Sequence, residues 1–273
     1  MLKEIPCAVT IAGSDSGGGA GIQADLKTFA ALGVHGASVL TCLTAQNPRR
    51  VSGIEACSPR MLRLQLEAVF DGLCPSAVKT GMLYSAAVMR AVAAFLKGRQ
   101  VPLVVDPVMV STSGKKLIEP AAVQTLCEKL LPIAALITPN LHEAGILVGE
   151  TPGSVETMRR VARVLNQRFG CAVLVKGGHL RGSKEAVDIY RDGKQELFLS
   201  APFVRGVRTH GTGCTYSAAV TACLARGLPL PRAVVRAKEY VTQAIAHSRK
   251  TAGNWVLGCA EMKPFDSKGL HSA

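Results

Sequence analysis

Short apolar segments alternate with longer amphipathic segments along most of the chain. The apolar segments have the length and aliphatic composition of buried strands, which are expected at Cys7–Ala12, Ala37–Leu43, Ser76–Thr80, Leu103–Asp106, Ala134–Thr138 and Ala172–Lys176. A helical period follows most of them and predicts helices at Gly21–Leu32, Pro59–Phe70, Ser85–Leu96, Pro120–Leu131, Leu141–Val148, Val155–Phe169, Cys214–Ala225 and Pro231–His247. This alternation predicts right-handed βαβ units and a mostly parallel sheet.

One pair of segments breaks the alternation. Val187–Tyr190 and Glu196–Leu199 are short and apolar, and the turn between them contains Asp192-Gly193. This arrangement is typical of a β-hairpin, so we expect an antiparallel pair at an edge of the sheet. No internal repeat or long linker interrupts the chain, and residues 1–273 are therefore expected to form a single α/β domain.

The composition agrees with a helix-covered parallel sheet and argues against other classes of protein. Apolar residues make up 48% of the 273 residues and aromatic residues only 4%, so the core must be mainly aliphatic. The net charge of +13 is dispersed over single Lys and Arg residues and short pairs. A solvated basic surface that attracts small anions explains this pattern, and no nucleic-acid partner is expected.

Cysteine usage and hydropathy indicate the compartment. The nine cysteines form no C-x-x-C motif and no zinc-like spacing, and the first residues lack the features of a signal peptide. The longest charge-free run, Thr28–Pro48, contains Gly, Asn and Pro, so no membrane-spanning segment is expected. A reducing, cytoplasmic location fits these features best.

Glycine and polar residues gather at the predicted carboxyl ends of the strands. In sheets of this kind, ligands bind at that edge. The segments are Gly13–Gly21, Thr44–Asn47, Lys79–Met82, Asp106–Met109, Thr138–Asn140 and Lys176–His179.

The glycine-rich segment Gly13–Gly21 lies between a strand and a helix, as a phosphate-binding loop would. It lacks the Lys of the G-x-x-x-x-G-K-[ST] motif and the spacing of the G-x-G-x-x-G motif. Two interpretations stay open: a tight turn with close packing, or a loop whose backbone N–H groups face a small ligand.

Asp106, Asn140 and Glu143 bring oxygen-bearing side chains to neighbouring strand ends. Asn140 and Glu143 stand three residues apart at a predicted helix start, where they could simply form a capping box. Together with Asp106 they also supply the ligands that Mg²⁺ prefers, and Mg²⁺ beside an anion-binding loop suggests phosphoryl transfer. Lys176 is either a surface lysine or a positive charge for a phosphate group.

Gly211-Thr212-Gly213-Cys214 comes just before a predicted helix. The first N–H groups of a helix have no intrahelical partners, so a glycine-rich approach leaves them open to an oxyanion. At this position Cys214 is expected to have a lowered pKa. The alternative is a tight turn in which Cys214 is a small apolar filler.

Taken together, these motifs resemble the ribokinase-like superfamily, and within it the hydroxymethylpyrimidine and phosphomethylpyrimidine kinases of thiamine biosynthesis. The matching segments follow the family's order over most of the chain: Thr10–Lys27, Thr44–Asn47, Lys79–Met82, Val105–Met109, Thr138–Asn140 with Glu143, Val175–His179 and His210–Thr215. The resemblance implies a three-layer α/β/α fold, a homodimer, and the use of ATP with Mg²⁺. It also implies two successive phosphorylations, of hydroxymethylpyrimidine to its monophosphate and then to its diphosphate.

The resemblance further implies a role for each matching residue. The expected catalytic set, with Cys214 as the base and the glycine-rich backbone as the anion hole, is Cys214, Gly211, Thr212 and Gly213. The expected substrate-binding set is Gln46, Asp15, Ala20 and Val108. Lys176, Asn140 and Glu143 are expected at ATP and phosphate, and Asp106 and Glu143 at Mg²⁺. An amide such as Gln46 suits an aminopyrimidine because it both donates and accepts hydrogen bonds.

Two features depart from the family pattern. Pro48-Arg49-Arg50 stands where a small uncharged turn is usual, and it could reshape the substrate lip or offer charge to a phosphorylated substrate. The Gly/His-rich finish is missing, so residues 254–273 are expected to form a mobile tail or to cover another part of the site. Two other functions stay open: a pyridoxine or pyridoxal kinase of the same superfamily, and a non-catalytic binder of pyrimidines or nucleotides.

Overall fold

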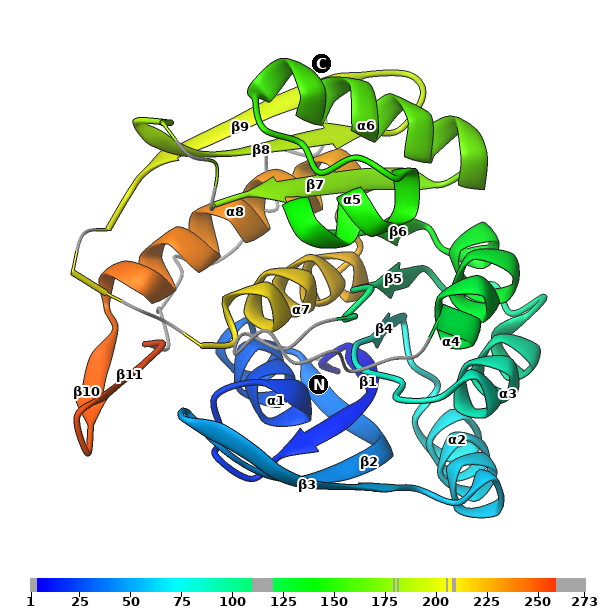
Figure 1. Cartoon of the computed structure of the whole chain (residues 1–273). Helices are drawn as coiled ribbons and strands as arrows, with labels where there is room; N and C mark the ends of the chain where they lie inside the picture. The colour runs from blue at the N-terminus through cyan, green and yellow to red at the C-terminus, as the bar shows by residue number, and fades with distance from the viewer. Residues whose placement is uncertain are drawn as a thin grey trace.

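A nine-stranded sheet runs through the middle of the computed structural model, which describes residues 4–109, 120–178, 180, 182–204, 206–207 and 210–258 (Figure 1). The strands lie in the order β3-β2-β1-β4-β5-β6-β7-β8-β9. Their bounds in chain order are Cys7–Asp15, His35–Asn47, Arg50–Ala56, Ala77–Thr80, Leu103–Val105, Leu136–Ile137, Ala172–Gly177, Glu185–Arg191 and Glu196–Pro202. The strands from β2 to β7 are parallel, whereas β3 at one edge and β8 with β9 at the other are antiparallel.

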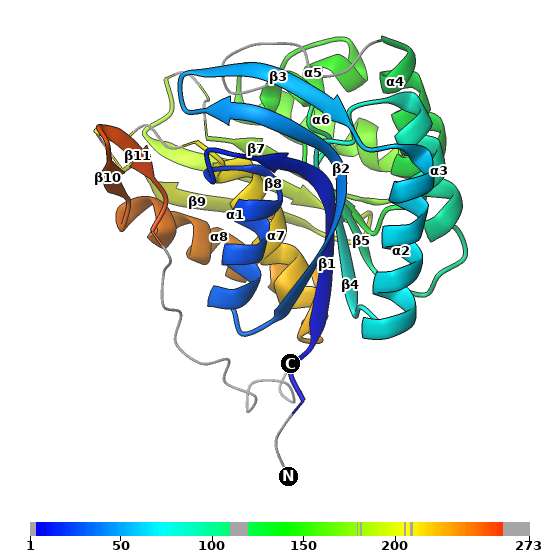
Figure 2. The ribbon, with the colours of Figure 1, turned by 90° about the horizontal axis from the view of Figure 1, so that it is seen from below.

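Helices cover both faces of this sheet and complete a three-layer α/β/α fold (Figure 2). One face carries α1 (Gly21–Ala31), α7 (Thr212–Ala225) and α8 (Leu230–Ala246). The other face carries α2 (Pro59–Leu73), α3 (Ala86–Leu96), α4 (Pro120–Thr125), α5 (Leu141–Val148) and α6 (Val155–Phe169). The predicted fold class, including the antiparallel hairpin at a sheet edge, is confirmed.

The central strands are apolar on both faces, which is why their sequences do not alternate between apolar and polar residues. In β1, Val9 and Ile11 pack in the core beneath α2 to α6, while Ala8 packs in the core beneath α1, α7 and α8. Helix α7 is buried along most of its length and contacts β1, β4 and β5. Its first turn is therefore held at the carboxyl ends of these strands.

The structure differs from the prediction where the first two strands end. β1 continues through Gly13–Asp15 and β2 continues through Thr44–Asn47, both of which the sequence predicted as loops. Beyond Asn47 the chain turns into β3, which pairs with the extension of β2. The hydrophobic pattern does not reveal β3 because most of its residues are exposed.

Three further segments differ from the prediction or lie beyond it. The expected helix Pro120–Leu131 is an α-helix only to Thr125, and a π-helical turn follows at Leu126–Leu130. The expected tail begins as strand β11 (Asn254–Val256), which pairs with β10 (Arg249–Thr251), and its residues 259–273 lie outside the described residues, as does His179. Within the described part of the chain, no helix combines the length and the apolar character needed to cross a membrane.

The helices begin in two different ways. Ser58, Ser85, Asn140 and Ser154 cap α2, α3, α5 and α6 with side-chain oxygens that accept backbone N–H groups. Helix α7 instead begins at Gly211, which has a φ of 83° and no side chain with which to cap the helix. The start of α7 is therefore not capped by a side chain of its N-cap residue.

Candidate active site

The glycine-rich turn after β1 is shaped by one buried carboxylate. Asp15 accepts hydrogen bonds from the backbone N–H groups of Gly17, Gly19 and Ala20, at 2.8, 3.1 and 2.8 Å. Burial acts to raise the pKa of Asp15, but His210 and the N–H groups of Ala20 and Gly17 together have the larger effect, and the pKa is lowered. The carboxylate therefore stays ionised. The structure therefore uses Asp15 and the N–H of Ala20, both predicted to contact substrate, to hold the turn in shape.

This turn lies directly against the start of α7. A Cβ atom built on Gly211 would collide with the carbonyl group of Gly19, and a Cβ built on Gly19 would lie 3.1 Å from Cδ2 of His210. Only glycines allow the two backbones to approach so closely. Two glycine motifs nearly 200 residues apart in the sequence thus form one continuous backbone surface.

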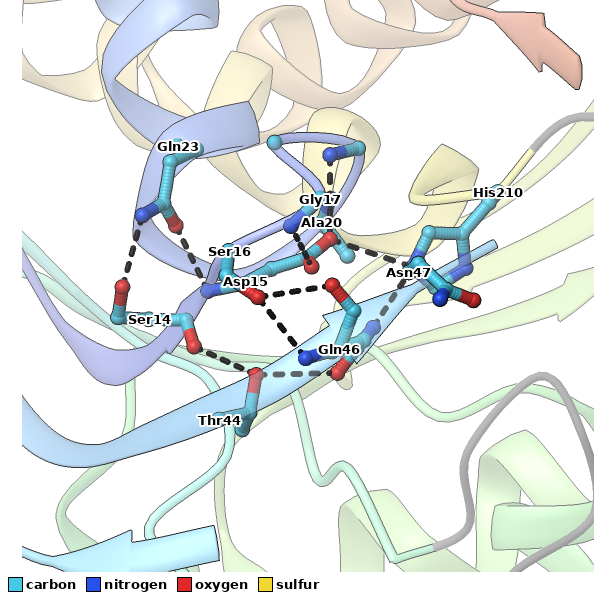
Figure 3. Close-up of polar contacts among 12 residues, drawn as sticks. Ser14, Asp15, Ser16, Gly17, Ala20, Gln23, Thr44, Gln46, Asn47 and His210 are labelled. Atoms are coloured by element: carbon cyan, nitrogen blue, oxygen red, sulfur yellow. Dashed lines mark hydrogen bonds and ion pairs between the residues drawn. The ribbon is translucent and has the colours of Figure 1, made fainter. Parts of the chain in front are cut away.

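Gln46, at the end of β2, is fastened to the same surface (Figure 3). Its backbone N–H donates to the hydroxyl of Ser16, which donates in turn to the carbonyl of Gln46, both at 2.8 Å. The Nε2 atom of its amide lies 3.1 Å from Nε2 of His210, the residue directly before Gly211. The predicted substrate-binding amide therefore lies beside the predicted anion hole.

Asp106 and Lys176 meet at the other side of the α7 start. Asp106 follows β5 and is buried, and its Oδ1 lies 2.8 Å from Nζ of Lys176 at the end of β7. Burial acts to raise the pKa of Asp106, but Lys176 and Lys79 together have the larger effect, so the pKa is lowered. A Cβ on Gly213 would lie 3.2 Å from Nζ of Lys176, so the glycine keeps the approach to this ammonium group open.

Asn140 and Glu143 form the capping box that the sequence allowed. The side chain of Asn140 accepts from the N–H groups of His142 and Glu143, and Glu143 Oε2 accepts from the N–H of Asn140 at 2.9 Å. This cap also belongs to the site, because the backbone of Asn140 pairs with that of Lys176 in the neighbouring strand β7. Burial, aided by Asp106, raises the pKa of Glu143 to about 7.

Asp106 and Glu143 are the two carboxylates that the sequence predicts as ligands of Mg²⁺. No cluster of three or more His, Cys, Asp or Glu side chains suited to a metal ion occurs among the residues that the structure describes. Asp106 and Glu143 alone do not surround a cation, and Lys176 lies beside Asp106. One or two carboxylates are nevertheless the usual protein share of a Mg²⁺ site completed by nucleotide phosphates and water, so the residues fit a nucleotide-bound Mg²⁺.

The expectation for Cys214 is wrong in one respect. Burial raises the pKa of its thiol to about 11, although Lys79 acts to lower it. Removal from water outweighs the nearby cation, so the thiol is protonated at neutral pH. Val108, predicted to contact substrate, is half-buried and lines a small cavity together with Asp106 and Gly81.

Two groups of this site were missed in the sequence. Lys79 and Asp25 form an ion pair of 2.8 Å in which both side chains are fully buried, and Thr10 donates to the same carboxylate oxygen at 2.6 Å. Charged residues within apolar segments were the signal that could have revealed this pair. His210 begins the motif His210–Thr215, and nothing in the sequence shows that it contacts Gln46.

Known proteins are similar to this chain in sequence and in fold. The family model "Phosphomethylpyrimidine kinase" matches residues 15–257. A hydroxymethylpyrimidine/phosphomethylpyrimidine kinase of Rhizobium meliloti (strain 1021) is 50% identical over 240 residues, which are 88% of this chain and 90% of the relative. A solved phosphomethylpyrimidine kinase of Clostridium difficile 630 is 42% identical, with a TM-score of 0.78 over 89% of this chain and 100% of the other. An ADP complex of Bacillus subtilis pyridoxal kinase is 37% identical, with a TM-score of 0.85 over 93% and 97%. Because the family model matches residues 15–257 and a relative is 50% identical over 88% of the chain, the chain belongs to the phosphomethylpyrimidine kinase family.

Proposed function

We propose that the protein transfers the terminal phosphoryl group of ATP to 4-amino-5-hydroxymethyl-2-methylpyrimidine and then to the monophosphate, in thiamine biosynthesis. The observation that carries the proposal is the convergence of the glycine-lined α7 start with Lys176 and Asp106. Phosphoryl transfer depends mainly on positioning and on stabilising the charge of the phosphoryl oxygens. A glycine-lined helix start and an ammonium group at one point suit both tasks.

The substrate is proposed to lie between Gln46 and Cys214. The amide of Gln46 offers a donor and an acceptor to the aminopyrimidine edge, while Val108 borders the ring. The hydroxymethyl group then points at Cys214, which accepts its proton late in the transfer. Asp15 contributes through the glycine-rich turn that it holds in shape.

Lys176, Asn140 and Glu143 are proposed to bind the phosphates of ATP, and Asp106 and Glu143 to hold Mg²⁺. When bound, Mg²⁺ supplies positive charge that bridges and neutralises phosphate oxygens. Asp106 keeps its negative charge because Lys176 and Lys79 lower its pKa. Asp106→Asn should therefore raise the Mg²⁺ concentration needed for half-maximal rate about tenfold or more, and an unchanged Mg²⁺ titration would remove Asp106 from this role.

A coupled ATP assay tests the activity. Purified protein is supplied with hydroxymethylpyrimidine, its monophosphate or pyridoxal, and products are identified by mass spectrometry. We expect phosphorylation of both pyrimidines. Absence of any phosphorylated pyrimidine would refute the proposal and leave the non-catalytic binder. Product from hydroxymethylpyrimidine but none from its monophosphate would refute the second step alone.

Pyridoxal kinase activity is the second candidate. The observation in its favour is the similarity to solved pyridoxal kinases, which exceeds that to the solved pyrimidine kinase in TM-score, 0.85 against 0.78. The relatives that match over most of their length with the higher identities are nevertheless named for the pyrimidine. The ratio of kcat/KM values for the two substrates decides between them, and we expect it to favour the pyrimidine.

Assembly and location are proposed on fewer observations. Leu43 of β2 and Met61 and Leu64 of α2 are exposed by 53%, 51% and 46%, and these two elements pack together. These exposed apolar side chains on neighbouring elements support a homodimer of single-domain chains, which light scattering during size-exclusion chromatography would show as twice the chain mass of 28.7 kDa. A cytoplasmic location follows from the expected supply of ATP and from eight cysteines that are unpaired among the described residues.

A further inference from the structure

The amide of Gln46 lies between two polar partners, and the one on the α7 side is His210 (Figure 3). Nε2 of His210 is 3.1 Å from the amide Nε2 of Gln46 and 3.5 Å from Oδ2 of Asp15. On its other side, the amide Oε1 is 3.3 Å from the hydroxyl oxygen of Thr44. The two ends of an amide have the same shape, so the hydrogens of its partners decide which end faces which partner.

Counting hydrogens at Thr44 gives the first indication. Its hydroxyl oxygen is 2.8 Å from the carbonyl oxygen of Ser14 and 3.3 Å from the Gln46 amide. A hydroxyl group has a single hydrogen, which the shorter contact uses. The contact with Gln46 then contains a hydrogen only if the NH₂ end of the amide faces Thr44.

Asp15 gives the second indication. Its buried carboxylate can only accept hydrogen bonds, and one of its oxygens faces Nε2 of His210. A hydrogen on this Nε2 makes the contact attractive, whereas a lone pair would make it repulsive. This Nε2 has a single hydrogen, which its shorter contact uses, so the end of the Gln46 amide that faces it at 3.1 Å is the accepting oxygen, while Asp15 at 3.5 Å favours a hydrogen on Nε2 over a lone pair. Both counts give the same orientation of the amide.

From these contacts we propose that His210 is a positioning residue that determines substrate specificity: its Nε2–H group, directed by Asp15, holds the Gln46 amide with its oxygen toward His210 and its nitrogen toward Thr44. The proposal rests on the proposed function for the identity of the ring. Each end of the amide keeps one further valence, an N–H and an oxygen lone pair, for the substrate.

The consequence is a fixed order of donor and acceptor along the amide. An aminopyrimidine presents its amino group and the adjacent ring nitrogen as a donor and an acceptor, in one order. If the amide were reversed, the ring would have to turn over to keep both hydrogen bonds. The hydroxymethyl group, which is adjacent to the amino group, would then move away from the α7 start. A pyridine ring without the amino group cannot make this pair of bonds, so the fixed amide favours the pyrimidine.

The protonation of His210 can be read without any substrate. The protein is labelled with ¹⁵N-histidine, and the His210 signals are identified by their loss in His210→Gln. We expect the ¹⁵N shift of a protonated Nε2 in the wild-type protein. An unprotonated Nε2 would overturn the proposal, because His210 would then accept from the amide instead of donating to it.

Kinetics test the effect on specificity. His210→Phe keeps an aromatic ring but no donor, and it should lower kcat/KM for hydroxymethylpyrimidine about ten- to a hundredfold while the value for pyridoxal changes less than about threefold. His210→Gln can again place an N–H near this point and should restore most of the loss. Equal losses for both substrates would overturn the proposal and indicate a structural role.

A double-mutant cycle tests whether His210 acts through Gln46. In a Gln46→Ala background, His210→Phe should change kcat/KM for the pyrimidine by less than about threefold, because there is no amide to orient. An undiminished loss in that background would overturn the proposal. A wild-type protein that phosphorylates neither ring would refute the proposed function instead, while the histidine spectrum would still decide the orientation of the amide.

Discussion

The pH dependence of turnover tests the role of Cys214 as the proton acceptor. Because burial raises the pKa of this thiol to about 11, its thiolate is the minor form at neutral pH. At pH 7, only about one Cys214 in ten thousand carries the thiolate that can accept a proton. Since the pKa is raised, the reactive form increases with pH, about tenfold for each unit below the pKa.

The assay is kcat/KM for hydroxymethylpyrimidine at saturating ATP and Mg²⁺. Between about pH 6.5 and 8.5 we expect a rise of roughly a hundredfold. Cys214→Ala should lower kcat about 10²- to 10⁴-fold and should remove the dependence on pH, with ATP binding unchanged. Cys223→Ala is the matched control, because Cys223 lies on the same helix and burial also raises its pKa, to about 12.

A flat pH profile in the wild-type enzyme would refute the reasoning, since a protonated thiol cannot accept the proton. So would a Cys214→Ala enzyme with near-normal turnover. An independent measurement is the alkylation of Cys214 by iodoacetamide, followed by mass spectrometry of its peptide. Its rate should rise with the same slope, whereas a plateau at the ordinary thiol pKa of 9.0 would show that burial does not govern this group.

Three further variants test how the site is supported. Lys79→Met should lower the free energy of unfolding by about 3–5 kcal/mol at neutral pH, because it leaves the buried Asp25 carboxylate unpaired. Burial raises the pKa of Asp25, so its carboxyl group gains a proton as the pH falls. In urea titrations the loss of unfolding free energy in Lys79→Met should therefore become smaller at lower pH, and an equal loss at all pH values would contradict the reasoning. Gly211→Ala should abolish most activity, whereas Gly227→Ala, with the same φ of about 84° and no neighbour within 4 Å of a new Cβ, should cost only stability, and equal kinetics in the two variants would refute the contact argument. Lys176→Met should raise KM for ATP at least about tenfold with unchanged circular dichroism, and an unaltered KM would exclude it from phosphate binding.

The sequence predicted the fold well where burial is uniform and poorly where it is not. Strand β7 is covered on both faces, so its apolar segment is clear in the sequence. β3 lies at an edge and is mostly exposed, so the hydrophobic pattern contains no trace of it. A different rule explains the site. Parallel strands end at one edge of the sheet, so the sequence alone predicted that Asp106 and Lys176 lie near each other, although it gave no distance between them.

Properties that depend on a balance of opposing effects could not be predicted. A cysteine at a helix start is expected to ionise readily, and only the structure shows that burial outweighs the nearby Lys79 at Cys214 and raises the pKa of its thiol. Likewise, Lys79 and Asp25 lie far apart in the sequence, and nothing in their own segments says that they neutralise each other. Sequence motifs thus predicted which side chains lie at the strand ends but not their protonation states.

The arrangement also indicates where substrate choice can be encoded. The start of α7 tolerates no side chain at Gly211 because the glycine-rich turn packs against it, so this end of the site, which we propose binds phosphate, has little freedom to vary. Proteins with the same fold are named for either pyridoxal or the pyrimidine. We therefore expect the difference between these substrates to be recognised at the ring end of the site, where the Gln46 amide lies beside His210.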